Sequence, residues 1–164
     1  MSRVALLLAL EGVLLAVGPA PSQLLRRRDA AKTPKPEAVA ETRLLMEGLN
    51  QANYRGLERL LRDKPADVEA WTFARGQALL IAETGNLLML RPPRGKGQDA
   101  WMDHAAELRD AATALARAAG RRDLERSRNA FRDLAGTCNR CHQDFRVTVR
   151  LTPFADSTEA ERGE

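Results

Sequence analysis

The chain has 164 residues, of which 44% are hydrophobic and only 4% aromatic, and its formal net charge is +4 at pH 7. This length suffices for one domain with a hydrophobic core. Abundant alanine, leucine and arginine, with few aromatic and β-branched residues, favour helix over sheet. The modest positive charge comes without clusters of basic and aromatic residues, which excludes a nucleic-acid-binding protein and indicates a solvated surface of mixed charge.

Residues 1–20 have the layout of an export signal. A basic start at Arg3 precedes an apolar run over Val4–Val17, and small residues follow up to Ala20. This order predicts export to the periplasm, with cleavage after Ala20. An uncleaved leader that anchors the protein in the membrane is the alternative, because Glu11 interrupts the apolar run and arginines follow at 26–28. The run is short and interrupted for a transmembrane helix.

The composition then divides the rest of the chain into three parts. Residues 21–35 contain Pro21, Pro34, Ser22 and five basic residues, and we expect a flexible linker there. Residues 36–150 hold the periodic apolar pattern of a folded domain. Residues 151–164 are polar and acidic, which predicts a disordered tail.

Four helical segments are predicted within the folded domain. The first runs from about residue 36 to residue 62, with Pro36 in its first turn, and its glycines allow a break near residues 50–53. The second runs from the capping residue Asp67 to about residue 90, and the third from about residue 98 to residue 119. The fourth runs from about residue 122 to residue 147. Short loops between antiparallel neighbours predict an all-α, up-down-up-down four-helix bundle.

The fourth segment carries the most specific motif in the chain, Cys138-Asn139-Arg140-Cys141-His142. A Cys-x-x-Cys-His run is typical of covalent attachment of c-type haem, because two thiols three residues apart can add across the two vinyl groups of one porphyrin. The following imidazole then lies at the iron. The apolar repeat of this helix places both cysteines on its buried face. Its members are Leu124, Ser127, Phe131, Leu134, Cys138, Cys141 and Phe145.

Three other interpretations of the motif are weaker. A structural zinc site needs about four ligands, and the only histidine left to complete it is His104. A thioredoxin-like redox pair requires a helix N-terminus in a strand-rich setting, which is absent from this sequence pattern. A disulfide between residues i and i+3 of a helix is sterically awkward and leaves His142 unexplained.

A helical domain with this motif in its last helix resembles cytochrome c-prime and its low-spin class II relatives. The resemblance covers about residues 34–147, and its most specific part is residues 134–146. It implies thioether bonds from Cys138 and Cys141 to one haem c, and proximal ligation of the iron by His142. It also implies that Arg146, which follows Phe145 as an arginine often does in the family, lies near the proximal face of the haem.

The resemblance places the residue opposite the haem in the first helix, where Met46 stands about a dozen residues after the helix start. Met46 is therefore our candidate for the distal side and for the sixth iron ligand, although a methionine on an apolar face is most often part of the core. A register one turn away would put Leu45 or Leu49 there instead. His104 is an alternative ligand, but its place at the edge of an apolar face is typical of a boundary residue.

Two functions follow from these expectations. The first is an exported electron carrier that exchanges electrons with a redox partner protein and catalyses no reaction. The second is binding of NO or CO at a five-coordinate haem. A peroxidase-like enzyme would need acid and base groups over the iron, which the surroundings of Met46 do not supply. The family often dimerises through its first two helices, and Leu44 and Leu45 would permit a homodimer here.

Overall fold

The computed structural model describes residues 34–155, and its compact helical unit begins at Pro36. The predicted leader, most of the predicted linker and residues 156–164 lie outside the described residues. The described part is all-helical between Thr42 and Asp144, without strands. This confirms the predicted all-α four-helix bundle.

The first helix of the bundle is a continuous helical stretch in three parts, α2 (Thr42–Leu45), the π-helix η1 (Met46–Asn50) and α3 (Gln51–Asp63). It begins six residues later than Pro36, the start that its sequence suggested. Residues 34–41 are not helical, and the carbonyl of Ala40 accepts a hydrogen bond from Arg91 Nε at 2.9 Å. The weakness expected near residues 50–53 takes the form of the π-helical turn just ahead of them.

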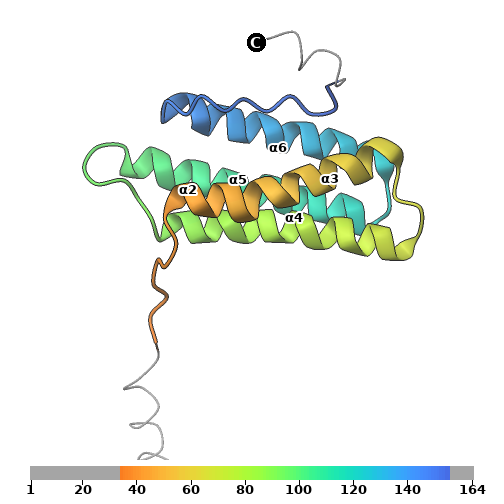
Figure 1. Ribbon diagram of the computed structural model, residues 1–164, viewed down its shortest axis with the longest axis horizontal. Helices are drawn as coiled ribbons and strands as arrows, with labels where there is room; N and C mark the ends of the chain where they lie inside the picture. Colours follow the sequence, from red (N-terminus) through yellow and green to blue (C-terminus); the bar gives the residue numbers. More distant parts are fainter. Residues whose placement is uncertain (1–33, 156–164) are drawn as a thin grey trace, which may run out of the picture. The chain divides into compact units, whose positions relative to one another are not determined.

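The other three helices lie close to their predicted bounds. They are α4 (Val68–Met89), α5 (Gln98–Gly120) and α6 (Leu124–Asp144). Asp67 caps α4 by accepting from Ala70 N at 2.8 Å, and Asp123 caps α6 by accepting from Arg126 N at 3.0 Å. Each cap satisfies a backbone donor that the first turn of a helix leaves free. Consecutive helices alternate in direction, as Figure 1 shows.

The core lies between these helices and is built from leucine, alanine and a few larger side chains. Its largest fully buried members are Phe131, Leu57, Leu61, Ile81, Leu115 and Leu134. The backbones of α4 and α5 come close at Gly85, where an added Cβ would lie 2.7 Å from the Ala105 carbonyl oxygen. Small residues at this crossing allow the two backbones to come close.

The chain reverses at the end of α6 and runs back along that helix, as Figure 1 shows for the dark blue segment. Residues 151–155 belong to the tail whose sequence predicted disorder, but the structure places them against the bundle. Leu151 and Phe154 pack on the core, and Phe154 N donates to Glu58 Oε1 at 2.7 Å. A polar composition misled the prediction, because these two apolar side chains are enough to hold the segment.

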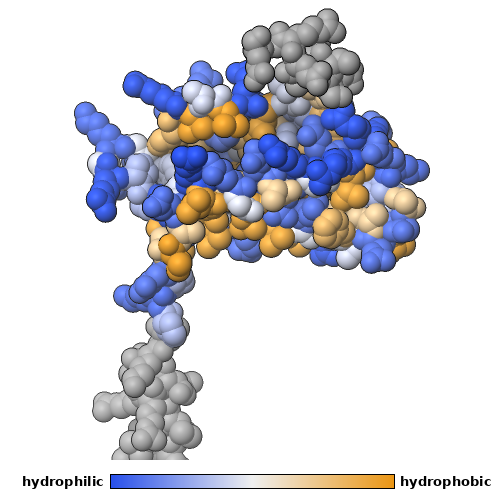
Figure 2. All heavy atoms as spheres, in the orientation of Figure 1, coloured by the Kyte–Doolittle hydropathy of each residue, from blue (hydrophilic) through white to orange (hydrophobic). Residues whose placement is uncertain are grey.

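Apolar side chains also gather on the outer surface over α4, as the orange atoms of Figure 2 show. Val68, Phe73 and Leu80 of α4 are among the exposed large hydrophobic residues. Of the two leucines expected to permit a homodimer, Leu44 is exposed but Leu45 is buried in the core. Leu45 therefore cannot widen an exposed face. Within residues 34–155, none of the helices has the length and apolar character to cross a membrane.

Candidate haem site

The central feature of the bundle is a cavity of about 810 Å³ at the end where the first helix begins and α6 finishes. Its walls come from the first helix, the end of α4, the first half of α5, the last turns of α6 and residues 147–151. Its size lies in the range of pockets that enclose a cofactor or a drug-sized ligand. Both cysteines, His142 and Met46 line this one cavity.

The Cys-x-x-Cys-His motif occupies the last two turns of α6. Cys138 is buried, with 6% of its surface exposed, and Cys141 and His142 are half-buried. The spacing of three and four residues puts all three side chains on the face of α6 that continues the core residues Phe131 and Leu134. The helix therefore presents two thiols and an imidazole together to the cavity.

Both thiols are protonated at neutral pH in this fold. Burial raises the pKa of the Cys138 thiol to about 12, helped by the negative charge that Cys141 would carry. Burial, with Asp144 and Glu107 nearby, raises the pKa of Cys141 to about 11. A reactive redox pair needs the opposite shift, so the thioredoxin-like alternative is not supported.

The remaining alternatives for the motif are also weakened. Cys138 and Cys141 are free thiols, which removes the disulfide. In the part of the chain that the structure describes, no group of three or more His, Cys, Asp and Glu side chains is placed to hold a metal ion, so the zinc interpretation gains no support.

His142 is oriented by a backbone carbonyl. Its Nδ1 lies 2.8 Å from the carbonyl oxygen of Val149. A carbonyl oxygen can only accept, so Nδ1 is the protonated nitrogen that donates, and Nε2 keeps a free lone pair. This is the tautomer that a histidine needs to ligate a metal through Nε2.

The first helix forms the opposite part of the wall. Met46, Asn50 and Tyr54 line the cavity at intervals of four residues, and Met46 and Asn50 are the two ends of the π-helical turn. Such turns are rare and often mark functional sites. Leu45 and Leu49, the candidates for a shifted register, do not line the cavity.

His104 and Arg146 lie differently from what their sequence context suggested. His104 was expected to be a surface or boundary residue at the edge of an apolar helix face. Only 12% of its side chain is exposed and it lines the cavity, with Nε2 2.7 Å from Asp144 Oδ2. Arg146 is exposed, does not line the cavity and follows the end of α6 with φ of 55°. The structure therefore does not bring Arg146 to the site.

The cavity wall contains buried polar atoms that lack hydrogen-bond partners and apolar side chains that are exposed to solvent. Tyr54 OH, Asn50 Oδ1 and His104 Nδ1 are buried without a hydrogen-bond partner among the described residues, and all three residues line the wall. The nearest carboxylate oxygen to His104 Nδ1 that is in ion-pair range is Glu107 Oε2 at 3.7 Å. Val147 and Val149 line the same space with about half of their surface exposed. Buried polar groups are normally hydrogen-bonded and large apolar surfaces normally covered. The wall therefore fits a large, mostly apolar group that carries polar substituents, as haem does.

The sequence did not reveal the roles of Tyr54, Asn50 or the segment beyond residue 146 in this wall. Tyr54 packs on Phe131 with ring centroids 4.5 Å apart, and burial raises the pKa of its phenol, so it stays neutral. The interval of four residues from Met46 through Asn50 to Tyr54 was the available signal. Polar residues on a helix face are ordinarily assigned to solvent, which concealed it.

Comparison with known proteins points to one class. Residues 96–146, just under a third of the chain, match the family model described as Cytochrome C'. This region covers α5 and α6 and contains both thiols and His142. No curated protein and no solved structure matches the chain. A four-helix bundle and a Cys-x-x-Cys-His motif that lines its cavity are the features expected of a c-type haem protein.

Over residues 96–146 the chain is similar to the Cytochrome C' family. This family binds c-type haem covalently, and the residues present fit that group: two cysteines on one helix face, a histidine with its Nε2 free, and a cavity that encloses them.

Proposed function

We propose that this protein is an exported electron carrier that holds a single haem c through Cys138, Cys141 and His142. The observation that carries the proposal is the shared cavity, which has the motif on α6 and the thioether of Met46 on the first helix in its walls. In this proposal Met46 is the sixth ligand. Axial histidine and methionine are the ligand pair of many electron-transfer cytochromes, and they raise the reduction potential of the haem.

The haem would supply the one-electron chemistry, and the chain would hold and shield it. Core residues such as Leu108 and Leu88 line the cavity and exclude water from its interior. The histidine in the wall, His104, is on α5 and is tied to Asp144. In this proposal the first helix faces the distal side of the haem, where a peroxidase-like enzyme needs side chains that act as acid and base. His104 is not on that helix, so we propose an electron carrier and not an enzyme.

The second candidate is the binding of NO or CO at a five-coordinate haem. The match to the Cytochrome C' family model favours it, because members of that family bind small gas ligands. In this alternative Met46 lines the distal side without bonding the iron, and the ligand occupies the space next to it. A redox partner protein belongs to the first proposal, and a homodimer is compatible with either; both remain predictions.

The proposed location is the periplasm. Its support is the order of a basic start, an apolar run and small residues over positions 1–20, which lie outside the described residues. Attachment of c-type haem on the outer side of the bacterial inner membrane agrees with export.

Optical spectra of the haem-loaded protein and of Met46→Ala test the ligand. We expect the wild type to be low-spin in both oxidation states, with sharp reduced bands and no response to CO. Met46→Ala should become high-spin and respond to CO, whereas Leu49→Ala, one turn along and outside the cavity wall, should keep the wild-type spectrum. A wild-type protein that is high-spin and binds CO would replace electron transfer with gas binding.

A further inference from the structure

The segment that follows α6, residues 147–155, is here called the C-terminal strap. It starts from a turn in which Arg146 adopts φ of 55°, Val147 N donates to the His142 carbonyl at 2.7 Å and Arg146 N donates to the Gln143 carbonyl at 3.2 Å. These two bonds form a Schellman motif, which ends a helix and redirects the chain. The strap therefore runs back along the helix that carries the haem motif (Figure 1).

The strap contacts the motif at two points. The Val149 carbonyl accepts from His142 Nδ1 at 2.8 Å. Two residues further on, Leu151 exchanges two hydrogen bonds with the side chain of Asn139: Asn139 Nδ2 donates to the Leu151 carbonyl at 2.9 Å, and Leu151 N donates to Asn139 Oδ1 at 2.8 Å. Asn139 is the residue directly after Cys138, so the motif itself holds the strap.

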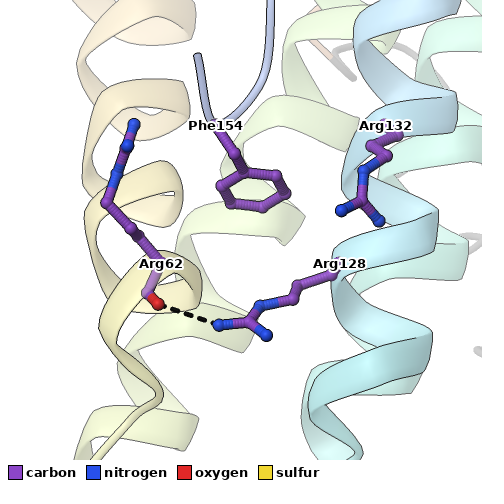
Figure 3. Close-up of a pocket in the computed structure, with 4 residues that line it drawn as sticks. All are labelled: Arg62, Arg128, Arg132 and Phe154. Atoms are coloured by element: carbon purple, nitrogen blue, oxygen red, sulfur yellow. Dashed lines mark hydrogen bonds between the residues drawn. The ribbon is translucent and has the colours of Figure 1, made fainter. Parts of the chain in front are cut away.

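The far end of the strap is anchored between α3 and α6. Figure 3 shows the Phe154 ring between Arg62 of α3 and Arg132 of α6. Its centroid lies 5.3 Å from that of Phe131, and the Arg132 guanidinium carbon lies 5.2 Å from the Phe154 centroid. Phe154 N also donates to Glu58 Oε1 at 2.7 Å. This anchor is outside the cavity wall.

We propose that the C-terminal strap is a positioning device for the haem ligand, in which Asn139 and Phe154 fix the Val149 carbonyl so that it orients His142 and increases the basicity of its imidazole. The proposal rests on the proposed function, because it takes His142 as the iron ligand. Hydrogen bonds to the second nitrogen of a ligating histidine fix its tautomer and strengthen its donation to the metal. A backbone carbonyl can do this only if the chain that carries it is held, and the strap is held at both ends.

The strap also covers the site. Val147, Val149 and Leu151 alternate along it and all line the cavity. Alternation of this kind places residues i, i+2 and i+4 of an extended segment on one side. Loss of the strap would therefore both release His142 and open the wall to water.

The test compares Asn139→Ala with Arg140→Ala in the haem-loaded, full-length protein. Both residues are the variable positions of the motif, but Arg140 bonds to Glu107 and Thr137 and not to the strap. The iron–histidine stretching frequency is measured by resonance Raman spectroscopy of the ferrous protein with Met46→Ala added to every variant compared, because that change opens the sixth position. The reduction potential is measured with Met46 in place. Asn139→Ala should lower the frequency and raise the potential. Arg140→Ala should keep the wild-type frequency, and its potential should not rise, because it loses a positive charge and not a contact with the strap.

Phe154→Ala gives a second test that leaves the motif intact. It should shift the frequency and the potential in the same direction as Asn139→Ala, because both variants release the strap. If both variants load haem and keep the wild-type frequency and potential, the strap only packs against the domain and the proposal is wrong.

A measurement without haem separates this proposal from the proposed function. In the haem-free full-length protein, nitrogen-15 NMR should show His142 with its proton on Nδ1, and Phe154→Ala should reduce that tautomer. A wild-type His142 with its proton on Nε2 would overturn the strap proposal whether or not the protein carries haem. A protein that shows the Nδ1 proton but never loads haem would overturn the proposed function, and with it the ligand role of His142, while the orientation of His142 by the strap would stand.

Discussion

Arg146 is held in left-handed backbone geometry by the turn that ends α6, and its exposed side chain does not line the cavity. A residue with a Cβ pays roughly 1–2 kcal/mol for this conformation. The turn at the end of α6 redirects the chain into the C-terminal strap, so the strap depends on this conformation of Arg146. Arg146 therefore shapes this turn through its backbone, and the contact with the haem that the family resemblance implied stays a prediction.

Arg146→Gly tests that role. Glycine adopts positive φ freely, but it also gains entropy in the unfolded chain, so we expect a net rise of about 0.5–1 kcal/mol in the free energy of unfolding. Urea denaturation of the haem-free protein measures it, and the haem spectrum should not change. Arg121→Gly, at the end of α5 with φ of −86°, is the control and should lose about 0.5–1 kcal/mol. A changed spectrum in Arg146→Gly would restore its side chain to the site.

The sequence predicted the main site residues because their spacing alone defines a helix face. Cys138, Cys141 and His142 needed only a helix through residues 138–142, and Met46 needed only the family pattern. The roles of Asn139 and Val149 could not be predicted from the sequence, because their contacts depend on where α6 ends. That end is marked by an arginine in a position where glycine would have been the usual signal.

The crossing of α4 and α5 gives the clearest prediction at the scale of an element. At Gly85 an added Cβ would meet the Ala105 carbonyl oxygen at 2.7 Å and Arg109 N at 2.9 Å, and both are backbone atoms that cannot turn aside. Gly76, on the same helix, has nothing within 4 Å of the corresponding point. Gly85 therefore lies against the backbone of α5, whereas Gly76 on the same helix has space for a side chain.

Gly85→Ala should lower the free energy of unfolding by about 1–3 kcal/mol, because the two helices must separate. Gly76→Ala should raise it by about 0.5–1 kcal/mol, because alanine is the better helix former. Urea denaturation with circular dichroism detection checks both variants. Equal effects of the two substitutions would contradict the close approach of α4 and α5.

The helices themselves were predictable to different degrees. The bounds of α4 and α5 followed from Asp67, from the loop prolines and from an uninterrupted apolar period. The first helix was placed six residues early, because Pro36 is a strong start signal and the sequence does not show that Arg91 binds the chain ahead of Thr42. The π-helical turn at Met46–Asn50 also follows from packing and not from local propensity.

At the scale of the whole molecule, the cavity separates the first half of the first helix from α6. A cavity of about 810 Å³ leaves the surrounding side chains without packing partners on that side. The π-helical turn and the strap are both part of its wall. The haem is therefore expected to be part of the core of the folded protein.

Removal of the haem should loosen the wall and leave the rest of the bundle intact. In hydrogen exchange of the haem-free protein, amides of residues 42–54 and 147–155 should exchange faster than in the haem-loaded form. Amides of the α4–α5 crossing, around Ala82 and Ala112, should change least, because both residues are buried away from the cavity. Uniform protection across the chain in both forms would show that the haem contributes nothing to the core.

The central claim is that the cavity holds haem covalently through the two cysteines of α6. Intact-mass measurement of the full-length protein, produced together with a c-type haem maturation system, tests it most directly. We predict one haem added to the wild-type chain under denaturing conditions and none added to the double variant Cys138→Ser/Cys141→Ser. A wild-type chain without added mass, or a double variant that keeps the haem, would contradict the account.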